Sequence, residues 1–263
     1  MTVVLIPARR ASTRLPEKLL LAEHGEPLIA TAARRAAEAF GAKSVTVCAD
    51  DEVLVAAARA AGVDAVMTRI DHQSGTDRIA EVALGRADAI VVNVQGDEPE
   101  MDPAHIRLVA GLLERHPWAG MATLCVPGGD SEQRNPNNVK VVLGNGDRAL
   151  YFTRSPAVWD RDRGAPSVNC YRHLGIYAYR REVLLSYGKL PASRLEQAEK
   201  LEQLRALEAG IGIACAVVEH ATPGIDVRAD YDAFLARWRA RPGSGVRGPG
   251  SSGLTSAVPK DVV

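Results

Sequence analysis

Residues 3–18 read VVLIPARRASTRLPEK, an apolar run that passes at a proline into a loop of small and cationic residues. The run 3–6 is mostly β-branched, which is typical of a strand buried on both faces of a parallel sheet, the usual first strand of an α/β domain. Beyond it, small side chains leave backbone N–H groups open to an anion, and four cations follow: Arg9, Arg10, Arg14 and Lys18. The stretch predicts a phosphate-binding loop, although the charges alone leave a solvated basic loop open.

The 263-residue chain is long enough to bury the core of one large α/β domain. Its 32 Lys and Arg residues balance its 32 Asp and Glu residues, so the overall field attracts neither nucleic acid nor a membrane surface. Any anion must therefore be bound by a local cluster. Because the first apolar run has only four residues, against the roughly 18 of a spanning helix, we expect no signal peptide, no membrane span and a cytoplasmic protein.

The four cysteines, Cys48, Cys125, Cys170 and Cys215, are widely separated and form no C-x-x-C pair. Three of them lie in apolar, strand-like runs. We therefore expect buried free thiols in a reducing cytosol rather than a disulfide framework or a metal site.

The first part of the chain, to about residue 117, alternates strand-like and helix-like segments, as a doubly wound parallel sheet requires. The strands are expected at 3–7, 44–49, 64–68 and 89–95, and the helices at 28–41, 52–61, 76–86 and from Asp102-Pro103 onward.

Between residues 118 and 190 the strands follow one another without helices, which predicts an antiparallel extension. Strands are expected at 120–126, 139–143, 149–153 and 172–179, with a hairpin at Asn145-Gly146. Residues 191–241 complete the domain. Here we expect the longest helix at 195–210, closed by Gly210, then a strand at 213–219 and a helix at 229–240. The Gly-, Ser- and Pro-rich tail 242–263 is predicted to be disordered.

A second candidate site is QGDEP, residues 95–99, directly after an apolar strand. Asp97 would lie at the carboxyl end of a central parallel strand, where ligands of such sheets bind. A carboxylate there, across from the cationic loop, could hold Mg²⁺ on the phosphates of a nucleotide. The alternative is an ordinary turn before Pro99.

Three further motifs are candidates. Residues 68–78, TRIDHQSGTDR, lead into a helix whose free N–H groups could bind a base edge or a phosphate. Strand alternation in RHLGIYAY puts His173 and Tyr177 on one face with Gly175 and Tyr179, facing either a ligand or one another. Asp226, in Gly224-Ile225-Asp226, adds an acidic group before the last helix.

Together these motifs resemble the 3-deoxy-manno-octulosonate cytidylyltransferases. The resemblance runs in order from about residue 3 to 235, through IPARRASTRLPEK, DHQSGTDR, VNVQGDEP, NPNNVKVV, ALYFTRSP, WDRDR, RHLGIYAYR, LEQAEKLEQLR and GIDVRADYD. It implies a Rossmann-like nucleotidyltransferase of the glycosyltransferase-A type over residues 1–241, with a central mixed sheet and an antiparallel extension that forms the dimer and sugar-binding side. It also implies Mg²⁺, a homodimer, and CTP and the eight-carbon sugar acid KDO as substrates for lipopolysaccharide synthesis.

The resemblance also implies roles for individual residues. Those at the nucleotide would be Ala8, Arg9, Ser12, Lys18, His72, Ser74, Arg78 and Gln95. Those at the sugar acid would be Gln95, Arg154, His173, Tyr177, Glu202 and Gln203. Asp97 and Asp226 would hold the metal and, with Arg9 and Lys18, form the catalytic set.

The chain departs from the family pattern at a few positions. Arg10 stands where an aromatic residue is common, Glu17 where glycine is common, and SVNCY precedes RHLGIY. A relative of KDO, such as 8-amino-KDO or a sialic-acid-like sugar, is the alternative substrate. Within the same fold, the competing enzyme is a glycosyltransferase that consumes a nucleotide sugar. The alternative from a different class is a nucleotide-binding regulator without turnover.

Overall fold

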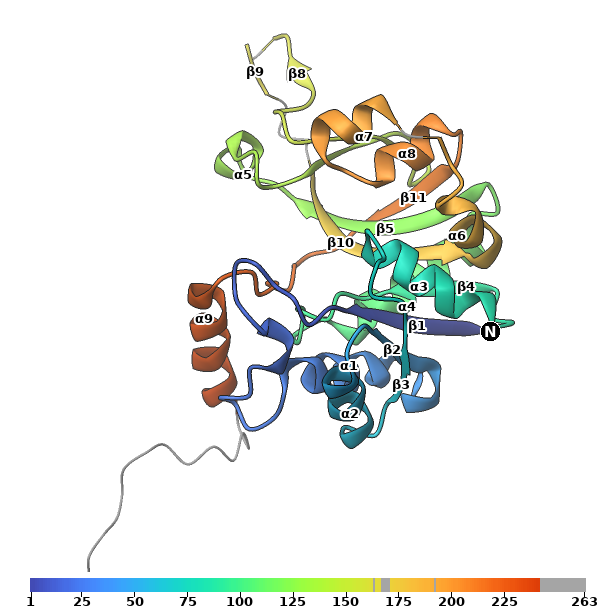
Figure 1. The fold of residues 1–263 in the computed structure, drawn as a ribbon. Coiled ribbons are helices and arrows are strands. Elements are labelled where there is room, and N and C mark those ends of the chain that lie inside the picture. The colour runs from blue at the N-terminus through green and yellow to red at the C-terminus, as the bar shows by residue number, and fades with distance from the viewer. Residues whose placement is uncertain (163, 167–170, 192, 242–263) are drawn as a thin grey trace, which may run out of the picture.

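The computed structural model describes residues 1–162, 164–166, 171–191 and 193–241 (Figure 1). The predicted disordered tail and Cys170 lie outside these residues. One mixed sheet of nine strands runs through the molecule in the order β11-β5-β10-β4-β1-β2-β3, with β6 beside β10 and β7 beside β6. Helices cover both of its faces. The expected central mixed sheet is therefore confirmed.

The first half of the chain forms the doubly wound part. Its strands β1, β2, β3 and β4 pair in parallel, as the alternating pattern predicts. The elements are β1 (Thr2–Ala8), η1 (Lys18–Leu20), α1 (Leu28–Phe40), η2 (Ala42–Ser44), β2 (Val45–Ala49), α2 (Glu52–Ala60), β3 (Asp64–Met67), α3 (Gly75–Leu84), β4 (Ile90–Asn93) and α4 (Pro103–Arg115).

The second half extends the sheet mainly by antiparallel pairing. Strand β10 runs antiparallel to β4, β5 and β6, whereas β11 pairs with β5 in parallel. The elements are β5 (Ala119–Pro127), α5 (Asp130–Arg134), β6 (Lys140–Leu143), β7 (Ala149–Thr153), β8 (Trp159–Asp160), β9 (Ala165–Pro166), β10 (Tyr171–Arg180), α6 (Arg181–Tyr187), α7 (Arg194–Glu199), α8 (Gln203–Glu208), β11 (Gly212–Val217) and α9 (Arg228–Arg239).

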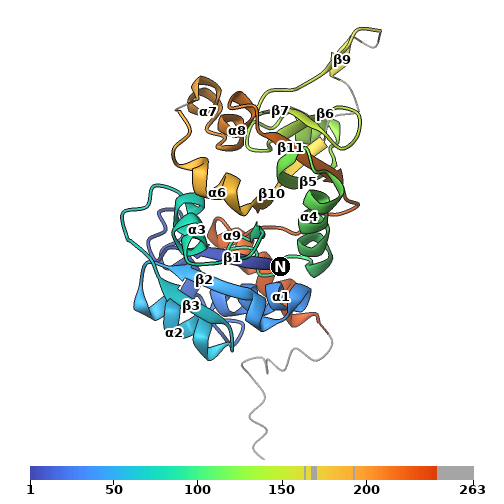
Figure 2. The ribbon, with the colours of Figure 1, turned by 90° about the vertical axis from the view of Figure 1, so that its right-hand side faces the viewer.

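Helices lie on both sides of the sheet (Figure 2). An apolar core fills the space between the helices and the sheet on each side. Along β1, Val4 and Ile6 enter the core beneath α1, α2 and α4, while Val3 and Leu5 enter the core beneath α3, α6 and α8. A strand buried on both faces explains why residues 3–6 are uniformly apolar. The described cysteines, Cys48, Cys125 and Cys215, are buried and free, as expected.

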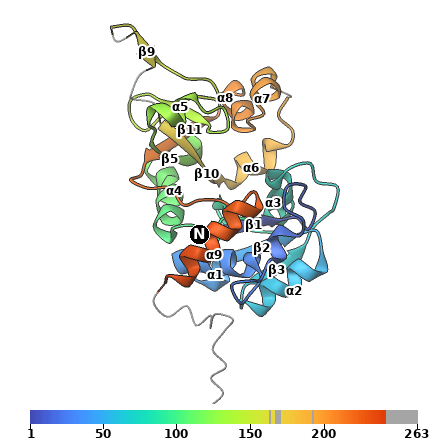
Figure 3. The same ribbon diagram turned by 90° about the vertical axis from the view of Figure 1, so that its left-hand side faces the viewer.

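Helix α9 returns to the first half of the chain and lies beside α1 (Figure 3). Its Tyr231 and Phe234 share a small apolar cluster with Leu28 of α1 and Leu15 of the cationic loop. The last helix therefore fixes the outer end of that loop. Among the described residues, no helix combines the length and the apolar character that crossing a membrane requires.

The prediction of one long helix at 195–210 is wrong. Two short helices, α7 and α8, replace it, because Lys200 takes a left-handed conformation (φ 55°) that ends α7. Leu201 then enters the core and is only 5% exposed, and the Glu202 backbone carbonyl accepts a hydrogen bond from the Tyr187 hydroxyl at 2.6 Å. Gly210 follows α8 with φ 76°, so its predicted role at the helix end is confirmed.

Candidate active site

The cationic loop after β1 lines a cavity of about 410 Å³. Segments far apart in the sequence meet here: the loop itself, the start of α3 at Gly75, the end of β4 at Gln95, Gly96 and Asp97, and Asp226 from the segment after β11. Three of the motifs predicted from the sequence therefore meet at this cavity, together with Asp226. Because β1 and β4 are parallel neighbours, their carboxyl ends bring the two loops to one edge of the sheet.

Lys18 lies at the centre of this edge and is only 9% exposed. Its Nζ lies 2.5 Å from Asp97 Oδ2 and 3.6 Å from Asp226 Oδ1. It also donates a hydrogen bond to the backbone carbonyl of Ile225 at 2.7 Å. The backbone N–H of Ile225 in turn donates to the carbonyl of Asp97 at 2.9 Å. Lys18 thus joins the two carboxylates predicted to bind a metal.

The chemistry of this donor set fits Mg²⁺. Two carboxylates from different segments converge, and their side chains remain 30% and 51% exposed for Asp97 and Asp226, so oxygen atoms are available to a hard cation. Arg14 makes a further ion pair with Asp226 at 2.8 Å. Lys18 and Arg14 thus balance the negative charge of the two aspartates, a role that a bound divalent cation could take over.

Glu98 is a site residue that the sequence analysis did not select. Burial, and secondarily the negative charges of Asp97 and Asp226, raise the pKa of its carboxyl to about 8. A Cβ on Gly175 would lie 3.7 Å from Glu98 Oε1, and one on Gly224 would lie 3.6 Å from its Cγ. A Cβ at either glycine would therefore make an ordinary van der Waals contact with Glu98.

The start of α3 belongs to the same site. Ser74 is the N-cap, because its hydroxyl accepts a hydrogen bond from the backbone N–H of Asp77 at 3.1 Å. A Cβ on Gly75 would lie 3.1 Å from Pro7 Cγ, so a small residue lets α3 approach the end of β1. The unpaired N–H groups of this helix start face the same edge as the cationic loop, which suits an anion.

Arg9, Ser12 and His72 line an adjoining cavity of about 620 Å³. His72 is held there by an ion pair with Glu81. Arg78 is different, because it is fully buried. Its guanidinium donates to Thr68 Oγ1 at 2.6 Å and pairs with Asp50 at 3.3 Å. Any influence of Arg78 on a nucleotide must therefore pass through the loop that it holds.

A third cavity, of about 240 Å³, is lined by four of the residues that the resemblance assigns to the sugar acid: Gln95, Tyr177, Glu202 and Gln203. Gln95 also lines the 410 Å³ cavity, so it connects the two spaces. Burial raises the pKa of both Tyr177 and Glu202. Thr76, at the start of α3, donates a hydrogen bond to Glu202 at 2.9 Å. The break between α7 and α8 therefore places Glu202 at this cavity.

His173 and Arg154 do not line that cavity. As predicted, His173 shares a face with Tyr177, with ring centroids 5.3 Å apart. Its Nε2 lies 2.9 Å from the Thr123 hydroxyl, and burial lowers its pKa to about 3, so the ring is neutral. Gly175 departs from the predicted alternation, because β10 has an irregular register between Leu174 and Tyr177.

Arg154 ties two loops together instead. Its Nε donates to the carbonyl of Glu199 at 2.8 Å, and its Nη1 donates to the carbonyl of Pro136 at 3.0 Å. Arg154 thus fixes the end of α7, two residues before Leu201 and the turn into the sugar-side cavity.

A mixed sheet whose parallel strands end at a cationic loop, a helix start and paired carboxylates has the arrangement of an enzyme of the nucleotidyltransferase class. The cytidylyltransferase family profile matches residues 3–213. A 3-deoxy-manno-octulosonate cytidylyltransferase from Rhodopirellula baltica is 47% identical over 243 residues, which are 89% of this chain and 97% of that protein. The chain belongs to the 3-deoxy-manno-octulosonate cytidylyltransferase family.

Solved structures agree. A structure of CMP:2-keto-3-deoxy-manno-octonic acid synthetase complexed with CTP has a TM-score of 0.86 and 41% identity, covering 91% of this chain and 98% of that chain. A cytidylyltransferase from Leptospira borgpetersenii has a TM-score of 0.61 and 16% identity, covering 92% and 88%. At 16% identity, the Leptospira structure shows a similarity of fold alone.

Proposed function

We propose that this protein transfers CMP from CTP to 3-deoxy-D-manno-octulosonate and releases pyrophosphate. The observation that carries the proposal is the convergence of Asp97 and Asp226 on Lys18, at a cavity that shares Gln95 with a second, sugar-sized cavity. Membership of the family supports the choice of substrates. A mere nucleotide binder has less need of two carboxylates at the sheet edge.

The chemistry is a direct in-line displacement. The C2 hydroxyl of the sugar acid attacks the α-phosphorus of CTP and releases its proton to solvent. A bond from that oxygen to phosphorus forms, and the bond from phosphorus to the bridging oxygen of pyrophosphate breaks. No covalent enzyme intermediate is needed. Transfers of this kind depend mainly on positioning and on neutralisation of charge.

The protein's own groups divide this work. Arg9, Ser12 and the loop N–H groups bind the triphosphate in the 410 Å³ cavity, and Lys18 keeps one N–H on the Ile225 carbonyl while its other two can turn to a phosphate. Gln95, Tyr177 and Glu202 orient the sugar acid. Asp97 and Asp226 would hold Mg²⁺, which when bound neutralises phosphate charge and increases the acidity of the attacking hydroxyl.

Pyrophosphate release tests the proposal. The enzyme is mixed with CTP, Mg²⁺ and each of KDO, 8-amino-KDO and a sialic acid. We expect rapid release with KDO, slower or no release with the other two, and none with CTP alone. Fast release with 8-amino-KDO or sialic acid but not with KDO would show that the substrate is that related sugar acid. No release with any of them, despite tight CTP binding, would favour a regulator.

We further propose a cytoplasmic homodimer. Supporting observations are the buried free thiols, which suit a reducing compartment, and exposed apolar side chains in the antiparallel half, including Leu150 and Trp159 at 53% and 67% exposure. Light scattering after size exclusion tests this: twice the chain mass supports the dimer, and the mass of one chain contradicts it.

A further inference from the structure

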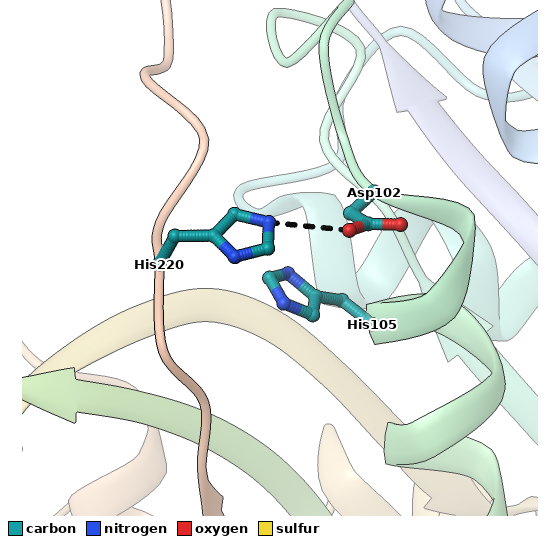
Figure 4. A group of neighbouring side chains, drawn as sticks. All are labelled: Asp102, His105 and His220. Carbon is teal, nitrogen blue, oxygen red and sulfur yellow. Dashed lines mark hydrogen bonds and ion pairs between the residues drawn. The ribbon is translucent and has the colours of Figure 1, made fainter.

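Three potential metal ligands meet beside the active site, at the start of α4. Among the described residues, Asp102, His105 and His220 form a group whose ligand atoms all lie within 4.8 Å of one another (Figure 4). The first two come from the N-cap and first turn of α4, and His220 comes from the segment after β11. None of the three belongs to the predicted nucleotide or sugar-acid sets.

The ligand atoms lie close together, and Asp102 already contacts His220. Asp102 Oδ1 accepts the backbone N–H of Ala104 at 2.8 Å, which fixes the carboxylate as the helix cap. Its other oxygen, Oδ2, lies 3.2 Å from Nε2 of His220. The rings of His105 and His220 lie 4.9 Å apart at 37°, which is neither stacked nor edge-on (Figure 4).

We propose that Asp102, His105 and His220 bind a divalent d-block cation of the zinc type, which links the segment after β11 to the start of α4. Two imidazoles and one carboxylate form a donor set for Zn²⁺ or Co²⁺ rather than for Mg²⁺, which prefers oxygen ligands alone. Three protein ligands leave a fourth position to water. His105 is 5% exposed and Asp102 is fixed as a cap, so two ligands are preorganised.

The consequence concerns the segment that supplies Asp226. This segment runs from His220 through Gly224 and Ile225, whose backbone contacts Asp97 and Lys18. A cation at His220 would anchor its near end to α4, as those contacts already anchor its far end. Cation binding should therefore slow hydrogen exchange across residues 218–227.

The test is a titration of the untagged, metal-free protein with Co²⁺ and then Zn²⁺, in excess Mg²⁺ so that carboxylate-only sites are filled. We expect one Co²⁺ per chain with the visible absorption of an imidazole-ligated ion, displaced by Zn²⁺. In H220A the Zn²⁺ affinity should fall by more than the about 10-fold to 100-fold that is lost when a residue hydrogen-bonded to a metal ligand is removed. His220 is 63% exposed, so this variant should fold normally.

Two further variants complete the design. D102N keeps a capping residue but removes the charge, so it should bind Zn²⁺ more weakly at unchanged metal-free stability. H116A is the matched control. His116 Nε2 lies 3.0 Å from the carboxylate of Asp147, and His116 belongs to no three-ligand group of the described residues. Wild-type affinity in both H220A and D102N, or no Zn²⁺ binding by the folded wild type, would overturn the proposal.

Discussion

The Lys18 ammonium lies 2.5 Å from the Asp97 carboxylate, although 79 positions separate the two residues. The same ammonium lies 3.6 Å from Asp226, which comes from the far end of the chain. The Lys18 ammonium therefore connects the loop after β1 to the loop after β4 and to the segment after β11. This relationship makes the cavity edge both a structural junction and a candidate catalytic centre.

Asp97→Ala should lower turnover by at least about 10²-fold, because a charged group at the reacting phosphate is lost. The side chain is 30% exposed at a strand rim, so the fold should persist. Pyrophosphate release at increasing Mg²⁺ measures the effect, and circular dichroism confirms folding. Near-normal, Mg²⁺-dependent activity would show that Asp97 does not hold the metal.

Arg78→Met should destabilise the protein by about 3–5 kcal/mol, because Asp50 would lose the partner of a buried ion pair. Arg78→Lys is the matched control, since it keeps the charge and should recover part of the loss. Denaturant unfolding measures both. If Arg78 served the nucleotide alone, Arg78→Met would leave stability unchanged and raise only KM for CTP.

Glu98→Gln should change the pH dependence of stability. The pKa of Glu98 is about 8 in the folded protein and near 4.5 in the unfolded chain, so the folded state retains a proton that the unfolded state has released. The free energy of unfolding therefore falls as pH rises from about 4.5 to about 8. The neutral glutamine removes this loss.

Calorimetry of the metal-free protein checks this. Glu98→Gln should raise Tm near pH 8, by roughly 2–4 °C for each kcal/mol regained, and should leave it unchanged at about pH 4. The exposed Glu114 provides a control, because Glu114→Gln should have little effect at either pH. The same Tm profile in Glu98→Gln as in the wild type would contradict the pKa shift of Glu98.

Lys200→Gly distinguishes the turn seen in the structure from the continuous helix 195–210 predicted from the sequence. In the structure Lys200 is left-handed, which costs a non-glycine residue about 1–2 kcal/mol, so glycine should stabilise the protein. In a continuous helix 195–210 glycine would instead destabilise it by roughly 1 kcal/mol. The sign of the change in Tm decides between them, with Lys189→Gly, at a residue of ordinary backbone conformation, as a comparison.

The parallel half of the fold could be predicted because its information is local. Residues 3–6 and 90–92 are uniformly apolar, and each run ends where the chain turns polar, so Asp97 could be placed at a strand end. Its distance from Asp226 could not be predicted from spacing, because α9 and the crossing segment after β11 decide it. The resemblance alone brought these two carboxylates together.

The errors arose where tertiary packing overrides the local pattern. Residues 195–210 have continuous helical periodicity, but the burial of Leu201 and the contact of Glu202 with Thr76 turn the chain at Lys200, which is not a residue that usually ends helices. Glu98 resembled a turn residue. Gly175 and Gly224, which lie close to it in the fold, are distant in the sequence.

The central claim is that Lys18 stabilises charge that develops as pyrophosphate leaves. Lys18→Met keeps most of the side-chain length and removes the charge. Arg10→Met is the control from the same loop, because Arg10 is 44% exposed and pairs with Glu17 and Asp51 at the outer cavity. Both variants should first be shown to be folded and to melt cooperatively.

The decisive measurement is steady-state kinetics with varied CTP at saturating KDO and Mg²⁺. The account predicts that Lys18→Met lowers kcat on the order of 10²-fold, while Arg10→Met stays near the wild type. A rise in KM for CTP with kcat unchanged would mean that Lys18 binds only the ground state. Unchanged kcat and KM in folded Lys18→Met would contradict the assignment of this loop as the catalytic phosphate site.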